Sequence, residues 1–279
     1  MYASTVRGLL VRGMLAGLIA GLFAFAVAYV VGEPPVRDSI AVEEAQAAQD
    51  AAGAAGAHAG HAGHGGDAAP AGAAEEEEEL VSRPVQSTFG LATGVLVYGV
   101  ALGGIASLAF SFALGRVGRF SPRATAALTA GAAFATVYLV PFLKYPATPP
   151  AVGNPDTIGK RTTLFFLMIL LSVLLGVGAI IIGRRLAPRL GNWNATLAAG
   201  GGFVAAAALA FVFLPANDDA VKPGFPAAVL WEFRIASLAV QLVLWAVFAI
   251  VFGVLAQRLL AVRADGAEAT AQRNAPALG

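Results

Sequence analysis

Every histidine of the chain lies within one short stretch rich in Ala and Gly, and a run of five glutamates follows it. Neutral imidazole is a good ligand for Co²⁺, Ni²⁺, Cu²⁺ and Zn²⁺, and a flexible chain can fold two or three histidines around one ion. We therefore predict a metal-collecting segment with the candidate ligands His58, His61, His64, Glu75, Glu76, Glu77, Glu78 and Glu79. The alternatives are a low-complexity linker for the histidines and a solvated acidic run for the glutamates.

Five further polar residues lie beside or within long apolar stretches, namely Lys144, Asp156, Glu232, Arg234 and Gln241. They are candidates for lining a transport path through an apolar environment or the entry to that path. Polar groups in apolar surroundings are costly and commonly functional. Each also has a structural alternative. Lys144 can extend its amine to water, Asp156 can cap a helix, and Gln241 can hydrogen-bond a neighbouring helix. Glu232 and Arg234 are two residues apart and do not share a helix face, so each is expected to find a partner elsewhere.

The composition identifies the environment of these residues. Of 279 residues, 58% are hydrophobic and 13% are charged, and the mean hydropathy is +0.73. Soluble domains carry about 25% charged residues. The apolar content exceeds what one globular core of this size can bury, so the chain is expected to be a polytopic membrane protein.

Six segments are long and apolar enough to span a bilayer as helices. We predict an all-α polytopic integral membrane protein of about six transmembrane helices, with a long disordered external loop after helix one. The segments are residues 8–31, 87–114, 124–143, 163–183, 193–214 and 235–260. Within the second, the pairs Gly90/Gly94 and Gly99/Gly103 would allow close approach of another helix backbone. The first could instead be a signal peptide, but its apolar run continues past the candidate cleavage sites.

The predicted organisation has four parts. An N-terminal transmembrane helix (1–31) precedes an external His/Glu-rich low-complexity segment (32–85), a five-helix membrane bundle (86–261) and a cytoplasmic tail (262–279). Most of 32–85 is expected to be disordered, with helix over 42–52 and glycines from Gly53 onward stopping it. The connection over 141–156 has five prolines and is expected to be a stiff extended loop.

The distribution of charge predicts the orientation. One side of the six-span arrangement collects eleven arginines against two acids, and the other carries seven basic residues against fifteen acids. Because positively charged loops stay in the cytoplasm, both termini are predicted to be cytoplasmic, in a bacterial-type inner (plasma) membrane.

Several chemistries are excluded or unsupported. The chain has no cysteine, which excludes disulfides, thiolate metal sites and cysteine nucleophiles. It lacks a phosphate-binding glycine loop, and no catalytic constellation is present, so we expect neither an enzyme nor a resident cofactor. The net charge of +1 indicates no nucleic-acid partner.

Several stretches resemble the CbtA family of predicted cobalt transporter subunits, which is usually described with five spans. The most specific is Lys144-Tyr145-Pro146 together with Asn154-Pro155-Asp156. The matching stretches are residues 10–17, 32–34, 82–88, 138–146, 153–157, 193–195, 225–226 and 234–237. The resemblance implies uptake of Co²⁺, with Ni²⁺ as an alternative cargo, in a complex with a small CbtB-like single-span membrane protein.

The sequence leaves three functions open. The first is a cobalt uptake subunit whose external His/acidic segment captures divalent cations. The second is a non-transporting membrane scaffold or accessory protein for a separate permease, in keeping with the scarcity of polar groups in the spans. The third is a permease for another solute. A homo-oligomer is a further assembly that the sequence leaves open.

Overall fold

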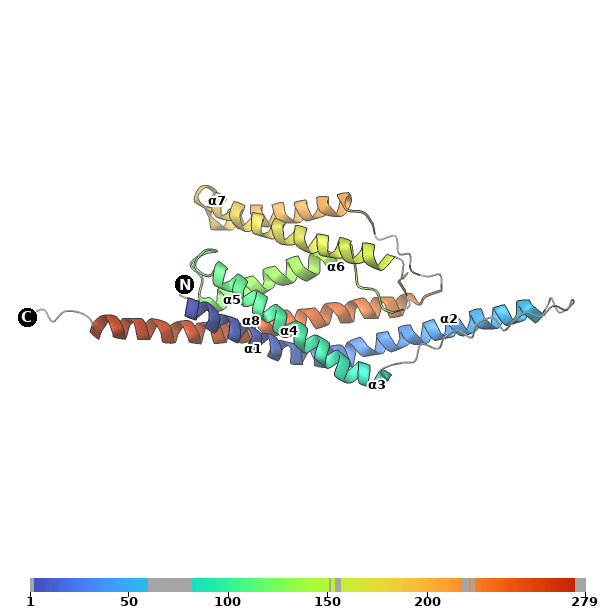
Figure 1. Cartoon of the computed structure of the whole chain (residues 1–279). Helices are drawn as coiled ribbons and strands as arrows, with labels where there is room; N and C mark the ends of the chain where they lie inside the picture. The colour runs from blue at the N-terminus through green and yellow to red at the C-terminus, as the bar shows by residue number, and fades with distance from the viewer. Residues whose placement is uncertain are drawn as a thin grey trace, which may run out of the picture.

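The computed structural model describes residues 3–59, 82–150, 152–153, 157–216, 221 and 224–273, and within these ranges it contains helices and no strand (Figure 1). The elements, with η for π-helical turns, are α1 (Ala3–Val27), η1 (Ala28–Gly32), α2 (Glu33–Ala59), α3 (Arg83–Val85), η2 (Gln86–Gly90), α4 (Leu91–Ala113), α5 (Pro122–Ala133), η3 (Phe134–Leu139), α6 (Val140–Lys144), α7 (Ile158–Phe213) and α8 (Ala227–Arg273). Five continuous helical stretches in the described part are long and apolar enough to cross a membrane. They are Ala3–Ala52, Arg83–Ala113, Pro122–Lys144, Ile158–Phe213 and Ala227–Gly266.

The first helix does not end where the apolar run ends. It passes through η1 into α2 and continues to Ala59, so the predicted stop of the helix at Gly53 is wrong. Glycine lowers helix propensity by about 1 kcal/mol but does not forbid helix, and the alanines around Gly53 and Gly56 are the strongest helix formers. The expected disorder is therefore absent from residues 33–59, and residues 60–81 lie outside the described part.

In two of the long helical stretches a π-helical turn precedes a proline. Proline has no N–H, and its ring clashes with the carbonyl four residues earlier. Before Pro34, the N–H of Glu33 donates to the carbonyl of Ala28, five residues back. Before Pro141, the N–H of Val140 donates to the carbonyl of Ala135 in the same way. Both helices therefore continue past their prolines.

The 56 residues of α7 form a helical hairpin. Gly191 has φ 75° and ψ 161°, a conformation open to glycine, and the chain reverses there (Figure 1). The two arms pack side by side, since a Cβ on Gly183 would lie 3.1 Å from that of Ala199. The predicted spans 163–183 and 193–214 are thus the two arms of this α7 hairpin.

The closest helix pair is α1 with α4. A Cβ on Gly17 would overlap the carbonyl of Gly99, and a Cβ on Gly103 would overlap the carbonyl of Gly13. The expected close approach at Gly99/Gly103 is confirmed, and its partner is a matching glycine pair on α1. The other predicted pair makes no such contact, because a Cβ on Gly94 would meet nothing within 4 Å.

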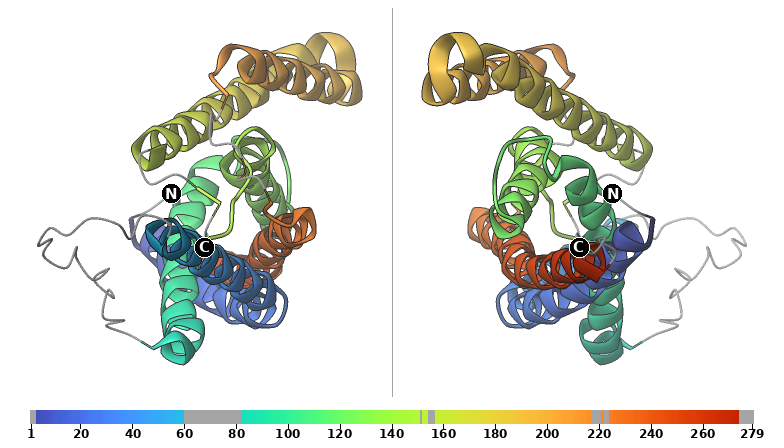
Figure 2. Two further views of the ribbon diagram at one scale, coloured as in Figure 1. Left: turned by 90° about the vertical axis from the view of Figure 1, so that its right-hand side faces the viewer. Right: turned by 90° about the vertical axis from the view of Figure 1, so that its left-hand side faces the viewer.

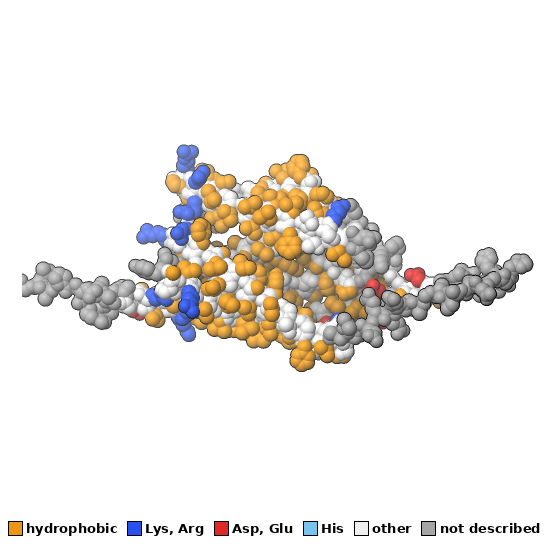
Figure 3. All heavy atoms as spheres, in the orientation of Figure 1, with side chains coloured by type: hydrophobic (Ala, Val, Ile, Leu, Met, Phe, Trp, Pro, Cys, Tyr) orange, Lys and Arg blue, Asp and Glu red, His pale blue; other side chains and the backbone are white. Residues whose placement is uncertain are grey.

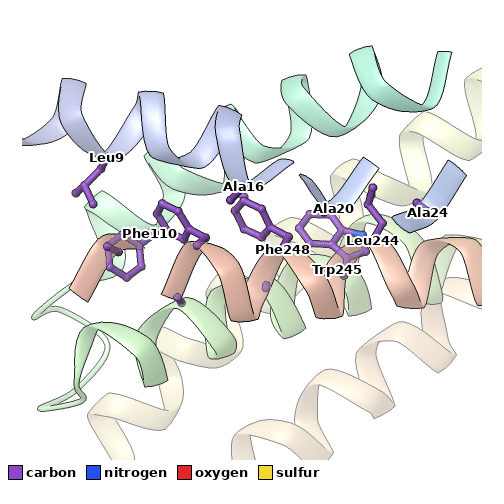
Figure 4. Packing of buried hydrophobic residues seen from close by; sticks show 13 residues of the cluster. Leu9, Ala16, Ala20, Ala24, Phe110, Leu244, Trp245 and Phe248 are labelled. Carbon is purple, nitrogen blue, oxygen red and sulfur yellow. The ribbon is translucent and has the colours of Figure 1, made fainter. Parts of the chain in front are cut away.

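Helices α1, α4, α5 and α8 form a four-helix bundle around one apolar core (Figure 4). The rings of Phe110 and Phe252 meet edge to face at 5.0 Å, and Phe252 stacks on Phe248 at 5.2 Å. Figure 4 shows the small residues Ala16 and Ala20 of α1 along the aromatic face of α8. Small side chains on one helix thus make room for large rings on the other.

The α7 hairpin stands outside the ring formed by the other helices (Figure 2). It packs on η3 and α6 through a stripe of residues four apart, in which Met168 and Ser172 are fully buried. The hydroxyl of Ser172 donates to the carbonyl of Thr136, and Gly176 faces the Thr136 methyl group. One helix face therefore joins the hairpin to the bundle.

Basic side chains gather at the end of the molecule where α1 begins, and acidic side chains are visible at the opposite end (Figure 3). The apolar surface lies between the two ends. The described side chains follow the charge asymmetry calculated from the sequence.

Candidate transport path

The proposed metal ligands fall almost entirely outside the described residues. His61, His64 and Glu75 to Glu79 lie in the gap between 59 and 82, and Asp156 lies in the gap 154–156. The backbone of His58 belongs to α2, but its side chain is not described. No group of three or more His, Cys, Asp or Glu residues that could hold a metal ion occurs in the part of the chain that the structure describes. The metal-collecting segment remains a prediction.

Lys144 binds the end of the α7 hairpin. Its Nζ donates to the carbonyl of Phe211 at 2.7 Å and lies 5.7 Å from the centre of the Tyr145 ring. The last carbonyls of a helix lack intrahelical partners and carry partial negative charge, so an ammonium group is favourable there. Lys144 thus connects α6 to a segment 67 residues away.

Tyr145 makes a second connection to the same segment. Its hydroxyl donates to the carbonyl of Pro215 at 2.8 Å, and the side chain is 7% exposed. Burial raises the pKa of Tyr145 above its ordinary value of 10.0. The hydroxyl therefore stays protonated and able to donate.

The loop of residues 145–150, which we name the proline cap, contacts three other helices. Besides the Tyr145 bond to the end of α7, the Nε of Arg234 on α8 donates to the carbonyl of Ala147 at 3.4 Å. The hydroxyl of Ser39 on α2 donates to the carbonyl of Pro150. The stiff loop expected from its prolines thus holds α2, α7 and α8 together at the acidic end.

Glu232 and Arg234 separate as expected from their spacing. Arg234 reaches the proline cap, whereas Glu232 is exposed on the first turns of α8. Arg83 and Glu33 form an ion pair at 2.6 Å. This pair joins α3 to the start of α2 and had not been predicted, although Glu33 and Arg83 both belong to stretches that carry the family resemblance.

Gln241 lies in the bundle, where its Nε2 is 3.4 Å from the hydroxyl of Tyr98 on α4. The hydroxyl of Tyr138 in η3 is buried and makes no hydrogen bond among the described residues. Sequence reasoning selected neither Tyr98 nor Tyr138 as a site residue. The available signal was that both tyrosines lie within otherwise apolar helices, where a hydroxyl needs a partner.

The comparisons with known proteins give a family. A family model described as probable cobalt transporter subunit (CbtA) matches residues 6–257, which is most of the chain. The match includes Lys144, Glu232, Arg234 and Gln241, together with the helices that carry them. No curated protein and no solved structure matches the chain.

Proposed function

Because this chain belongs to the CbtA family of probable cobalt transporter subunits, we propose that it is the membrane subunit of a system that takes up Co²⁺, with Ni²⁺ as a second cargo. The family match is the observation that carries the proposal. The all-α architecture with five long apolar helical stretches supports it, because a transporter subunit must cross the bilayer. A transporter subunit family is not a class of enzymes.

The proposed topology has six crossings, with the two arms of the α7 hairpin each spanning once. One arm lies on each side of Gly191, and each arm has more than twenty residues. That length is enough to cross about 30 Å of hydrocarbon. Both termini then lie at the arginine-rich end, which the positive-inside rule assigns to the cytoplasm of a bacterial-type cell. The proline cap and α2 lie on the external side.

The external His/acidic segment is proposed to collect divalent cations near the external entry of the transport path. Support comes from composition alone, since three imidazoles and five carboxylates follow one another within 22 residues. Replacing His58, His61 and His64 with Ala is expected to raise the external Co²⁺ concentration for half-maximal uptake and to leave the maximal rate unchanged. A control replaces Ala57, Ala59 and Ala62 with Ser. Equal half-maximal concentrations in both variants would remove the segment from the proposal.

Glu232 is proposed to attract the cation at the external entry of the transport path. It is exposed on the first turns of α8, beside the Arg234 anchor of the proline cap. Glu232→Gln should lower the maximal uptake rate, and Asp38→Asn, which removes an exposed acid from α2, should not. Equal rates in the two variants, at equal membrane levels, would make Glu232 a structural residue.

The alternative is a non-transporting scaffold that supports a separate permease. The absence of a His, Cys, Asp or Glu cluster from the described residues favours it, because a permease must bind its ion at least transiently.

Purified protein in liposomes, with and without a small CbtB-like partner, distinguishes the two functions. Radioactive Co²⁺ entry above that of empty liposomes supports the uptake subunit. A lack of entry from folded protein under both conditions supports the scaffold, and entry of another ion alone would indicate a different permease.

A further inference from the structure

A groove of about 580 Å³ runs between α1 and α4 on the outside of the bundle. Three residues of α1 and seven of α4 line it, and none of them has a polar side chain. The groove is open to its surroundings, since Val97 and Ile105 on its α4 side are both more than 60% exposed. A Cβ on Gly104 would only reach ordinary van der Waals contact with Met14 and Leu10, so a small residue helps to leave the space. The groove therefore suits an apolar occupant that enters sideways from the bilayer.

The length of the groove corresponds to one leaflet of a membrane. On α4 its lining extends from Leu96 to Leu108, which is about 18 Å of helix. The hydrocarbon core is about 30 Å thick, so one leaflet contributes about 15 Å. Dividing the volume by the length gives a mean cross-section of about 32 Å². A helix with its side chains is about 10–12 Å across and needs more than twice that area. The dimensions therefore fit an extended acyl chain better than a helix.

Two exposed arginines follow the groove at the basic end of the molecule (Figure 3). On α1, Arg7 lies almost one helical turn before Leu10, which lines the groove. On the other side, the largely exposed Phe112 lies one turn beyond Leu108 on the same face of α4. The Nη1 of Arg116 donates to the carbonyl of Phe112 at 3.1 Å, and its guanidinium carbon lies 5.0 Å from the centre of the Phe112 ring. The guanidinium of Arg116 is thus turned back toward the end of the groove.

These arginines have no counter-charge nearby in the sequence. Neither forms an ion pair with a residue that the structure describes. The chain has no acid before Glu33 and none between Glu79 and Asp156, which leaves α1, α4 and the loop after α4 without carboxylates. A guanidinium carries five N–H donors, and its planar fork fits phosphate oxygens. An external phosphate group is therefore favourable at this end of the groove.

We propose that the groove between α1 and α4 binds an anionic phospholipid, with one acyl chain along the groove and the phosphate between Arg7 and Arg116. A free anion would leave the apolar groove uncovered, and a neutral lipid would leave the arginines without a counter-charge. Lipid tails surround the whole bundle and are as apolar as its surface. The arginines therefore decide which lipid binds, and the groove decides where it binds. The site does not depend on the proposed uptake function.

Native mass spectrometry of the purified full-length protein tests the headgroup. The first phosphatidylglycerol should bind about tenfold more tightly than the first phosphatidylcholine, because arginines attract an anionic headgroup. Arg7→Gln combined with Arg116→Gln should reduce this preference to about twofold. The control, Arg184→Gln combined with Arg185→Gln, removes the same charge from exposed positions before the α7 turn and should keep the preference. Equal losses in the two double variants would mean general surface charge and would overturn the site.

Filling the groove tests the position of the acyl chain. Ala101→Phe places a ring in the groove, and Ala109→Phe makes the same change at an exposed position of α4 outside it. Ala101→Phe should weaken binding of the first phosphatidylglycerol at least fivefold, and Ala109→Phe should not. Equal binding by the two variants would place the lipid elsewhere and overturn the proposal.

Fluorescence quenching locates the lipid without filling the groove. Leu108→Trp lies in the groove, and Ile180→Trp is an exposed position on the α7 hairpin. The signal of the native tryptophans is subtracted. In phosphatidylcholine vesicles with a small fraction of phosphatidylglycerol brominated on its acyl chains, Leu108→Trp should be quenched more strongly than Ile180→Trp. Adding the Arg7 and Arg116 substitutions should remove the difference, and equal quenching from the start would contradict the proposal.

Two other occupants give different results. Particles of twice the mass that persist in Ala109→Phe but are lost in Ala101→Phe would show that a second copy covers the groove. Displacement of the lipid by inorganic phosphate would show an anion site that does not use the groove. Either result would overturn the phospholipid site.

Discussion

The four-helix bundle and the α7 hairpin are both built from long apolar helices but are packed in different ways. In the bundle, glycines of α1 and α4 face each other so closely that a single added carbon would overlap a backbone carbonyl. In the hairpin, a Cβ at Gly200, Gly201 or Gly202 would meet nothing within 4 Å. Lipid is as apolar as leucine, so close packing rather than hydrophobicity holds membrane helices together. The bundle is therefore expected to be the stable part of the molecule and the hairpin the part that can shift.

The largest expected effect comes from filling the glycine contact. Gly17→Leu places a branched side chain against the carbonyl of Gly99, and overpacking of this kind typically costs 1–3 kcal/mol or more. The helices must separate to admit it, so we expect a large fall in Tm and loss of monodisperse protein in detergent. Gly201→Leu makes the same change on the hairpin, where space is open, and should change Tm by only a few degrees. Similar losses in both variants would abolish the distinction between the two regions.

A smaller effect is expected where the hairpin is attached. Lys144→Met removes the hydrogen bond from Nζ to the carbonyl of Phe211, and a hydrogen bond from a charged group contributes about 2 kcal/mol. Hydrogen exchange should accelerate over residues 208–216 and remain unchanged over α1 and α4. Lys144→Arg keeps a charged donor and should retain most of the protection. Faster exchange in the bundle as well would mean that Lys144 stabilises the whole fold.

A third effect concerns the turn of the hairpin. At φ 75° and ψ 161°, a conformation essentially confined to glycine, Gly191→Ala introduces backbone strain of roughly 1–3 kcal/mol. Gly201→Ala, in a helix with open space around it, should instead stabilise the arm by up to about 1 kcal/mol. Thermal unfolding in detergent should therefore show shifts of opposite sign for the two substitutions. Shifts of the same sign would contradict the assignment of Gly191 to a reversal.

The helices were predictable to the extent that they depend on local properties. Apolar runs of about 20 residues located each long helix, and the close approach at Gly99/Gly103 followed from spacing alone. The continuation of the first helix to Ala59 was not predicted, because composition was taken to indicate disorder where Ala-rich sequence supports helix. The role of Lys144 was also not predicted, since its partner is 67 residues away.

Some residues of the candidate site were predictable from the sequence, and others became visible only in the structure. Gln241 stood out as an amide within an apolar run, and Arg234 and Glu232 were expected to seek separate partners. Tyr98 became a candidate only when α4 and α8 brought its hydroxyl within 3.4 Å of the Gln241 amide. An aromatic hydroxyl in a span looks the same in sequence whether it faces headgroups, lipid or a cavity.

The sequence by itself determined that this protein lies in a membrane, that it is helical, that its charge is asymmetric and which family it resembles. Each of these properties depends on composition and on short-range spacing. The tertiary structure decided which glycines meet and how the proline cap joins α2, α7 and α8. These contacts join residues up to 111 positions apart. Helix packing, which depends on shape across the whole bundle, therefore sets them rather than any local pattern.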